Sequence, residues 1–417
     1  MPHLKRRPAL TAAGVAAAIA LLTGCTSADG GASSAPGTTR ATDAGIQSLL
    51  EQAAAEQVEA RALGSLVAEI RIDGAVVASI ALGEAMAGTP VSFDGTFRNG
   101  AVAITYVSTV MLRLAEEGVI DLDEPISRWL PDFPDADEIT PRMLADMTAG
   151  VNDHVANGDF IDAVVADPFR SWTNEELLEL SQSTPRLFDP GANWDYSHSG
   201  YVLLAEVMEA ASGSSLEELI DEYVLRPLDL EHTVPDQTAA MPEPVIHAFT
   251  AERGVWEDST FWNPSWTLPE GAVQSSTIDD IAASFDAIVG RGELLDDDSY
   301  AQLIEPALVG FGAPLEGCRS CHEMTEEWSY GLGTMLAGDW VLQTPLFGGY
   351  ASTVATLPAS RADDGRSVTV AVAVTYTEDS FEDWGATLGN WANELARGLG
   401  AQLVPGNPPP AFQAPTH

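Results

Sequence analysis

The hydrophobic positions that follow Phe97 recur at intervals of three and four residues, which is the spacing of one face of a helix. This helix is predicted to begin at Val102, and its apolar face holds Ile104, Val107, Met111 and Leu114. Asn99 and Gly100 before it are turn residues, and Gly118 is a suitable residue to end it. The pattern therefore predicts a short loop that leads into a buried helix.

Other segments alternate between apolar and polar positions and predict strands. Two apolar runs, 65–72 and 75–82, flank an Asp-Gly pair, which is a strong signal for a β-hairpin. A helical pattern over 46–62 precedes this hairpin. A run of β-branched residues over 366–377 predicts a strand, and 381–399 predicts a terminal helix. The folded region therefore contains both helices and strands.

The first 24 residues have the features of a bacterial export signal. Basic residues precede an apolar run over 9–22, which is too short to span a membrane as a permanent helix. Leu22-Thr23-Gly24-Cys25 matches the lipobox, in which the cysteine becomes the lipid-carrying N-terminus of the mature protein. The alternative is an ordinary signal peptide with a chance cysteine. Residues 25–44 are predicted to be the lipid anchor and a disordered tether of Ser, Thr, Gly and Ala.

These features divide the chain into a leader, a tether, one large domain and a tail. The domain is predicted over residues 45–403, and a Pro-rich tail follows over 404–417. An export signal with a lipobox implies that the domain is held at the extracytoplasmic face of the cell membrane.

The charge of the chain excludes some partners. The 417 residues carry a formal net charge of -43, from 19 basic and 62 acidic residues. Such a chain is repelled by nucleic acid and by anionic lipid head groups, so we expect no nucleic-acid partner and membrane contact through the lipid anchor only. Lys5, in the export signal, is the sole lysine of the sequence. Arginine stays protonated at physiological pH, so it cannot replace lysine as a base.

Five segments, in order along the chain, carry a family resemblance. They are Phe97-Arg-Asn-Gly-Ala-Val-Ala-Ile, 120–133, 139–150, Phe188-Asp-Pro-Gly-Ala-Asn-Trp-Asp-Tyr-Ser-His, and Tyr330-Gly-Leu-Gly. In type and spacing they resemble the serine β-lactamase and penicillin-binding family, closest to the class C β-lactamase and DD-carboxypeptidase branch. The resemblance implies an α/β (α+β) fold, in which helices flank an antiparallel sheet and a mainly helical lobe is inserted at about residues 115–265. It also implies an active-site cleft between the lobe and the sheet.

The residues that react in this family are largely missing here. Where the family has a nucleophilic Ser and a Lys one helical turn later, this chain has Ala101 and Ile104. The Tyr of the second motif is kept as Tyr196, but His198 stands at its Asn position. The third motif begins with His or Lys in the family, and the corresponding region 343–352 contains neither.

The missing residues decide the functional prediction. A serine hydroxyl needs an adjacent base to become a nucleophile, and loss of both groups removes almost all such chemistry. We therefore expect a pseudoenzyme that binds a cell-wall peptide, another ligand or a protein partner in the old cleft. The alternative is a β-lactamase-like, DD-peptidase-like or esterase-like serine hydrolase with a non-standard nucleophile. It would need a Ser, Thr or Cys in the cleft within hydrogen-bond reach of His198; otherwise His198 is a hydrogen-bonded residue that fills the cleft.

Aromatic residues are concentrated in the segment 252–269. Trp256, Trp262 and Trp266 in this loop are candidates to line the cleft, and ordinary loop packing is the alternative reading.

Cys318-Arg-Ser-Cys321-His322 has the spacing of a covalent haem site, but the flanking loop offers no cytochrome domain. In an exported protein we expect a local disulfide between Cys318 and Cys321, with free thiols, zinc or haem as alternatives. A redox protein acting through these cysteines is a third functional hypothesis. Our main prediction includes no cofactor and no metal, and it expects a monomer.

Overall fold

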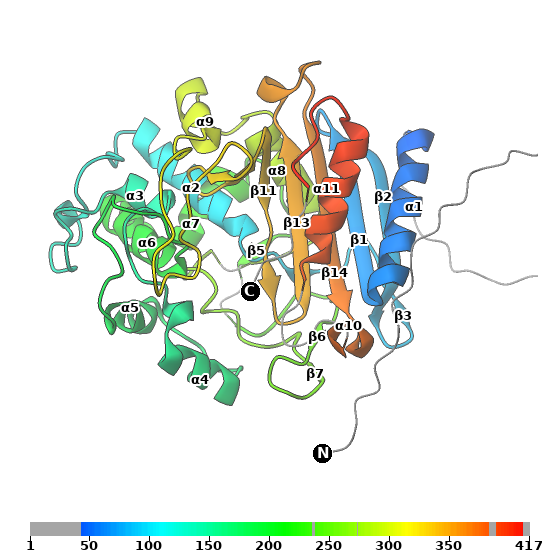
Figure 1. Cartoon of the computed structure of the whole chain (residues 1–417), viewed down its shortest axis with the longest axis horizontal. Helices are drawn as coiled ribbons and strands as arrows, with labels where there is room; N and C mark the ends of the chain where they lie inside the picture. The colour runs from blue at the N-terminus through cyan, green and yellow to red at the C-terminus, as the bar shows by residue number, and fades with distance from the viewer. Residues whose placement is uncertain (1–42, 236–237, 273, 383–388, 412–417) are drawn as a thin grey trace, which may run out of the picture. The chain divides into compact units, whose positions relative to one another are not determined.

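The computed structural model describes residues 43–235, 238–272, 274–382 and 389–411 (Figure 1). The predicted leader, Cys25 and nearly all of the predicted tether lie outside these residues. Within the described ranges, no helix is both long and apolar enough to cross a membrane.

Nine strands of the described residues form one antiparallel sheet, in the order β3-β2-β1-β14-β13-β11-β10-β9, with β12 paired to β13. Their bounds are β1 Leu63–Ile72, β2 Ala75–Met86, β3 Thr89–Pro90, β9 Ser329–Tyr330, β10 Met335–Ala337, β11 Trp340–Gln343, β12 Leu346–Phe347, β13 Tyr350–Leu357 and β14 Val368–Tyr376. The hairpin predicted around Asp73-Gly74 is confirmed as β1 and β2, because Ile72 pairs with Ala75.

Helices cover both faces of this sheet (Figure 1). Helices α1 (Ala44–Arg61) and α11 (Trp391–Leu403) pack side by side on one face, and α8 (Ile278–Phe285) packs on the other. Strand β14 shows the alternation that two buried faces require. Val370 and Val372 belong to the core under α1 and α11, whereas Ala371 and Ala373 belong to the core of the opposite face.

Most of the other helices lie beside the sheet, on the left of Figure 1. They include α2 (Val102–Glu116), α3 (Pro141–Ala145), α4 (Gly158–Ala166), α5 (Asn174–Gln182), α6 (His198–Ser212), α7 (Leu216–Ile220) and α9 (Asp297–Ile304). A short helix, α10 (Glu378–Glu382), follows β14. The short strands are β4 (Phe97–Arg98), β5 (Val234–Pro235) and β8 (Gln274–Ser276) in one sheet, and β6 (Phe249–Thr250) and β7 (Glu257–Asp258) in another.

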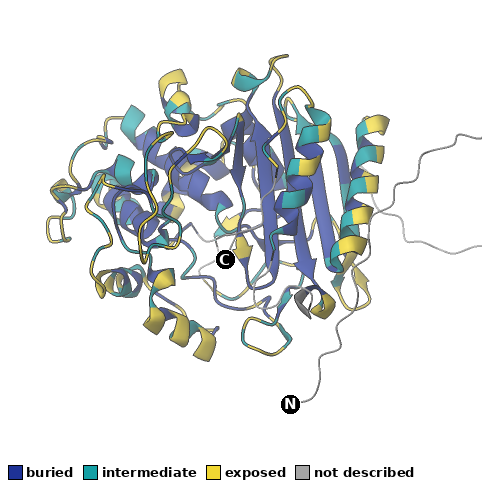
Figure 2. Ribbon diagram, in the orientation of Figure 1, coloured by how far each residue is buried: buried dark blue, intermediate teal, exposed yellow. Residues whose placement is uncertain are grey.

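The buried helix predicted from Val102 is confirmed as α2. Of its fifteen residues only Arg113, Ala115 and Glu116 are not fully buried, and Figure 2 shows the adjoining strands equally buried. Such an all-round buried helix is held by packing rather than by its own propensity. The loop predicted before it is corrected in part, because Phe97 and Arg98 form β4 and pair with Ser276 and Ser275.

The prediction for the end of the chain is also corrected. The helix predicted over 381–399 begins at Trp391 and ends at Leu403, because the Asn390 side chain caps it by accepting a hydrogen bond from Asn393 N. Residues 383–388 of that prediction lie outside the described residues. Part of the Pro-rich tail packs on the domain, where Trp340 Nε1 donates to Asn407 O and Arg397 donates to Pro410 O.

Candidate functional site

The start of α2 carries the position where the resembled family has its nucleophile. Ala101 is the residue immediately before the helix and is half-buried. Gly100 before it has a left-handed backbone with φ +50°, and a Cβ atom at Gly100 would lie 2.6 Å from Cβ of Pro345. The segment after β11 therefore lies directly against the start of α2, as the family's third motif is expected to do.

Ile104, at the family's lysine position, is fully buried in the hydrophobic core. The next residue ties the helix to the region of the third motif. Thr105 Oγ1 donates to Gly333 O at 2.9 Å, and Gln343 Nε2 donates to Thr105 Oγ1 at 3.2 Å and to Gly333 O at 2.8 Å. Gln343 is itself fully buried. The groups next to the missing lysine thus serve packing and hydrogen bonding inside the fold.

Tyr196 is the residue that the family resemblance assigns to the tyrosine of the second motif. Its ring meets those of His198 and Tyr330 edge-on, with centroid distances of 5.2 Å and 6.4 Å. Burial raises the pKa of the Tyr196 hydroxyl far above its ordinary value, and the nearby Asp153 carboxylate raises it further. The protonated form of the Tyr196 hydroxyl is therefore favoured.

His198 is oriented by Asp153, a pairing that sequence reasoning missed. Asp153 Oδ2 lies 3.0 Å from His198 Nδ1, and Asp153 Oδ1 accepts from the His198 backbone N at 3.2 Å. Burial alone would raise the pKa of the Asp153 carboxyl, but His198 and His154 outweigh it and hold this pKa below its usual value. His198 is the first residue of α6, and the preceding Ser197 caps that helix. The pair therefore resembles the histidine and carboxylate of a hydrolase triad.

A second histidine, His154, lies beside this pair and is fully buried. Its Nε2 lies 2.9 Å from Trp266 O, and its Nδ1 lies 2.9 Å from Ser199 Oγ. A carbonyl can only accept, so we assign the proton to Nε2, which leaves Nδ1 to accept from the serine. Burial lowers the pKa of His154 to about 4. His154 is therefore a neutral structural residue, although the sequence revealed no partner for it.

Among the described residues, no Ser, Thr or Cys side chain is hydrogen-bonded to the His198 ring. The polar contacts recorded for the His198 ring in this part of the chain go to Asp153, and none goes to a Ser, Thr or Cys side chain. Ser199 lies within reach of His154, but both residues are fully buried, so a substrate cannot approach them. The hydroxyls of Thr184 and Ser320 line the same pocket as His198, but neither is hydrogen-bonded to its ring in the described residues.

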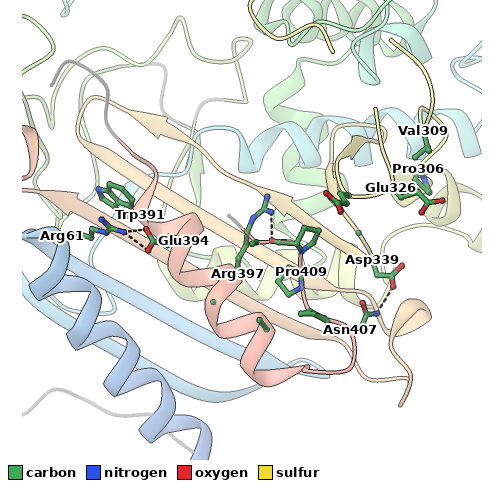
Figure 3. A pocket seen from close by; sticks show the side chains of 17 residues that line it. Arg61, Pro306, Val309, Glu326, Asp339, Trp391, Glu394, Arg397, Asn407 and Pro409 are labelled. Atoms are coloured by element: carbon green, nitrogen blue, oxygen red, sulfur yellow. Dashed lines mark hydrogen bonds and ion pairs between the residues drawn. The ribbon is translucent and has the colours of Figure 1, made fainter. Parts of the chain in front are cut away.

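A pocket of about 620 Å³ opens next to His198. Its lining includes Asp153, Tyr196, His198, Arg319 and Asn152. Of these, Arg319 is exposed and Asn152 is half-buried, so the pocket offers a cation and an amide to a ligand. A larger pocket of about 1180 Å³ lies elsewhere, between α11 and residues 407–411 (Figure 3).

The three tryptophans predicted to line the cleft do not lie together. Trp262 is buried, and a Cβ atom at Gly348 would lie 3.4 Å from its ring. Trp266 packs against Phe347, with ring centroids 5.7 Å apart. Trp256 instead stacks on Phe249 and packs against the core that lies under α1 and α11.

The predicted disulfide between Cys318 and Cys321 is confirmed. Its loop contacts the second motif directly, because Ser320 Oγ accepts from Tyr196 N at 2.8 Å and donates to Asp195 Oδ1. With both sulfurs in one bond, neither is available for a thioether link to haem, so the sequence signal for haem is explained by the disulfide.

The antiparallel sheet with flanking helices is a β-lactamase/transpeptidase-like fold. The profile of the Beta-lactamase family matches residues 50–388, which is more than half of the chain, and the chain therefore belongs to this family.

Individual relatives support the same membership over shorter stretches. "Penicillin-binding protein 4*" of Bacillus subtilis is 27% identical over 164 residues, which is 38% of this chain and 34% of that protein. "Esterase EstB" of Burkholderia gladioli is 33% identical over 166 residues, 36% of this chain and 41% of that protein. The chain matches 34% to 50% of the length of the first curated relatives. A penicillin-binding protein homologue from Pyrococcus abyssi shares the fold, with a TM-score of 0.69 and 19% identity over 87% of this chain and 78% of that chain.

Proposed function

We propose that this protein is a pseudoenzyme of the Beta-lactamase family, which binds a ligand in the cleft without turning it over. The observation that carries the proposal is the pair Ala101 and Ile104 at the nucleophile and base positions. Alanine has no lone pair with which to attack a carbonyl. Ile104 is fully buried, so its apolar side chain occupies the place that a catalytic lysine would need.

The remaining groups near the cleft do not replace the lost chemistry. Tyr196 is held in its protonated form by burial. Residues 25–417 contain no lysine, and arginine does not release its proton. His198 has the carboxylate partner of a general base, but the described residues give it no hydroxyl or thiol to activate.

The ligand class we favour is a cell-wall peptide that ends in D-amino acids. One relative is named a penicillin-binding protein, and the pocket beside His198 presents Arg319 to a carboxylate. A guanidinium is well suited to bind a carboxylate because it offers paired donors. The strong negative charge of the chain makes a local cation the natural point of contact for an anionic ligand.

Binding without turnover can be measured directly. A peptide that ends in D-Ala-D-Ala is titrated into the purified protein by calorimetry, and the mixture is then analysed for released D-alanine. We expect saturable binding and no release. Ala156→Phe should abolish binding, because Ala156 lines the pocket beside His198 and the larger side chain would fill it. Ala166→Phe, at an exposed position on α4, is the matched control and should bind normally. Release of D-alanine would contradict the proposal, and so would unchanged binding by Ala156→Phe.

A second candidate function rests on the Asp153–His198 pair, which is the base half of a hydrolase triad. In this reading a hydroxyl or thiol approaches His198 only when substrate is bound. The discriminating variant is His198→Gln, tested against short-chain ester substrates. Hydrolysis by the natural protein that is lost in His198→Gln would favour this function over the pseudoenzyme.

We also propose that the protein is lipid-anchored through Cys25 at the extracytoplasmic face of the cell membrane. The support is the lipobox Leu22-Thr23-Gly24-Cys25 after an apolar run. Cells that express the natural protein and Cys25→Ser are fractionated, and the mass of the mature N-terminal peptide is measured. We expect a diacylglycerol on Cys25 and release of the variant from the membrane. An unmodified Cys25, or membrane retention of the variant, would contradict the proposal.

A further inference from the structure

Three groups with metal-binding chemistry converge beside the cleft and are not used by the proposed function. An Asp195 carboxylate oxygen and the sulfurs of Cys318 and Cys321 all lie within 4.8 Å of one another. The three residues are half-buried, so the cluster is reachable from solvent. They come from two segments more than 120 positions apart in the sequence, and the fold alone brings them together.

The backbone around the two cysteines is arranged to keep this geometry. Cys321 N donates to Cys318 Sγ at 3.0 Å, and Cys318 N donates to Leu315 O at 3.1 Å. An N–H group directed at a sulfur favours the thiolate form, which is the form that binds metals. The loop is also fixed from the other side, because Ser320 contacts both Tyr196 N and the Asp195 carboxylate. The three ligand groups are thus held near one another by contacts other than the disulfide itself.

We propose that reduction of the Cys318–Cys321 disulfide converts this cluster into a Zn²⁺ site with Cys318, Cys321 and Asp195 as ligands. Two thiolates and one carboxylate form a ligand set that suits Zn²⁺, whereas Ca²⁺ and Mg²⁺ prefer oxygen ligands only. Zinc is four-coordinate in such sites, so three protein ligands leave one position for water or a bound ligand. That position borders the 620 Å³ pocket, because Asp195 and the neighbours Gly317, Arg319 and Ser320 line it.

Reduction of the disulfide is a balanced reaction when a dithiol supplies the electrons and protons. The S–S bond between Cys318 and Cys321 breaks, and two electrons and two protons come from the dithiol, which becomes a disulfide. When Zn²⁺ binds, the two thiols lose their protons to solvent, so affinity should rise with pH. In the oxidised protein the sulfurs are bonded to each other, and only Asp195 would remain as a ligand. The site is therefore specific to the reduced state.

A C-x-x-C-H sequence would suggest His322 as a further zinc ligand. In this structure, however, the His322 side chain makes other contacts. Its Nδ1 lies 2.6 Å from Ser320 O. Its ring packs against Trp328 and Trp194, with centroid distances of 4.7 Å and 5.5 Å. We therefore expect zinc affinity to be unchanged in His322→Ala, which makes this variant a sharp control for ligand identity.

The test uses full-length protein that carries Cys25→Ser, so that only Cys318 and Cys321 supply thiols. The protein is reduced with a phosphine, freed of reductant under nitrogen and titrated with Zn²⁺ against a chromophoric chelator. Titration with Co²⁺ then reports thiolate ligation by its charge-transfer absorption. We expect one Zn²⁺ per reduced chain, none per oxidised chain, and an affinity at least about 10-fold lower for Asp195→Asn.

Two further variants test which side chains bind the metal. Cys318→Ser together with Cys321→Ser should remove binding and the Co²⁺ signal, whereas His322→Ala should keep both. A thermal melt of each reduced sample checks that the domain is still folded. Equal zinc binding by the oxidised protein, or no binding by a folded reduced protein, would overturn the proposal, and so would full affinity in Asp195→Asn. This inference does not depend on whether the cleft is catalytically inactive.

Discussion

Gly100 and Pro345 are in direct contact, although 245 positions separate them in the sequence, and a Cβ atom on Gly100 would lie 2.6 Å from Cβ of Pro345. The contact joins the segment after β11 to the start of α2, where the family resemblance predicts the third motif and the nucleophile. Ala101 and Ile104 stand at the positions that the family resemblance assigns to the nucleophilic serine and its lysine.

The first prediction concerns this contact. Gly100→Ala should lower the free energy of unfolding by about 2–4 kcal/mol, because it combines a steric clash with a left-handed backbone. Gly118→Ala is the matched control. Gly118 also has a positive φ, +69°, but no atom lies within 4 Å of its added Cβ. It should lose only about 1–2 kcal/mol from backbone strain. Equal losses in urea unfolding would show that Pro345 is not a rigid neighbour of Gly100.

The second prediction concerns the buried Ile104. Ile104→Lys places an ammonium group in a fully buried apolar site and should cost about 3–5 kcal/mol at pH 7. Burial lowers a lysine's folded pKa below its unfolded value, so the neutral form is favoured and the loss should shrink toward pH 10. Ile104→Met, of similar volume, should cost less than about 1.5 kcal/mol. A loss below about 1 kcal/mol for Ile104→Lys at pH 7 would mean that the site still accepts a lysine.

The third prediction concerns how much His154 contributes to the free energy of unfolding as the pH falls. Its pKa falls from 6.5 to about 4 on folding, chiefly because of burial, and Asp153 and His198 are the titratable groups that face it. The neutral form is favoured, so its stabilising effect is complete above pH 6.5 and is lost as the pH falls toward 4. The difference in unfolding free energy between the natural protein and His154→Gln should shrink by up to about 3 kcal/mol over this range.

Chemical unfolding of both proteins at several pH values between 4 and 7.5 measures this difference. A constant difference between the natural protein and His154→Gln across the range would contradict the neutral, buried state of His154.

Sequence patterns were sufficient to predict the helices and strands that depend on neighbouring residues alone. The hairpin of β1 and β2 follows from an Asp-Gly turn between apolar runs, and α2 follows from its regular apolar spacing. The family resemblance assigns Tyr196, Ala101 and Ile104 to motif positions, because such an assignment depends only on residue identity at fixed spacing. The strand formed by Phe97 and Arg98 was missed, because its partner β8 lies more than 170 positions away.

The polar contacts of the site were not predictable from sequence for the same reason. Asp153 and His198 are 45 positions apart, and Trp266 O meets His154 across 112 positions. Neither contact leaves a pattern of spacing in the chain. Ser320 likewise reaches Tyr196 only through the fold, so the role of the disulfide loop as a wall of the cleft needed the structure.

The measurement that tests the central claim most directly is covalent labelling followed by intact-protein mass spectrometry. The purified protein is incubated with a fluorescent penicillin and, separately, with a broad serine-reactive phosphonate, alongside the double variant Ala101→Ser, Ile104→Lys. The account predicts no adduct on the natural protein with either reagent, because no hydroxyl stands at position 101 and no base at position 104. Labelling of the double variant alone would show that the cleft remains open and only the chemistry was lost. An adduct on the natural protein would contradict the pseudoenzyme account, and the labelled residue would identify the replacement nucleophile.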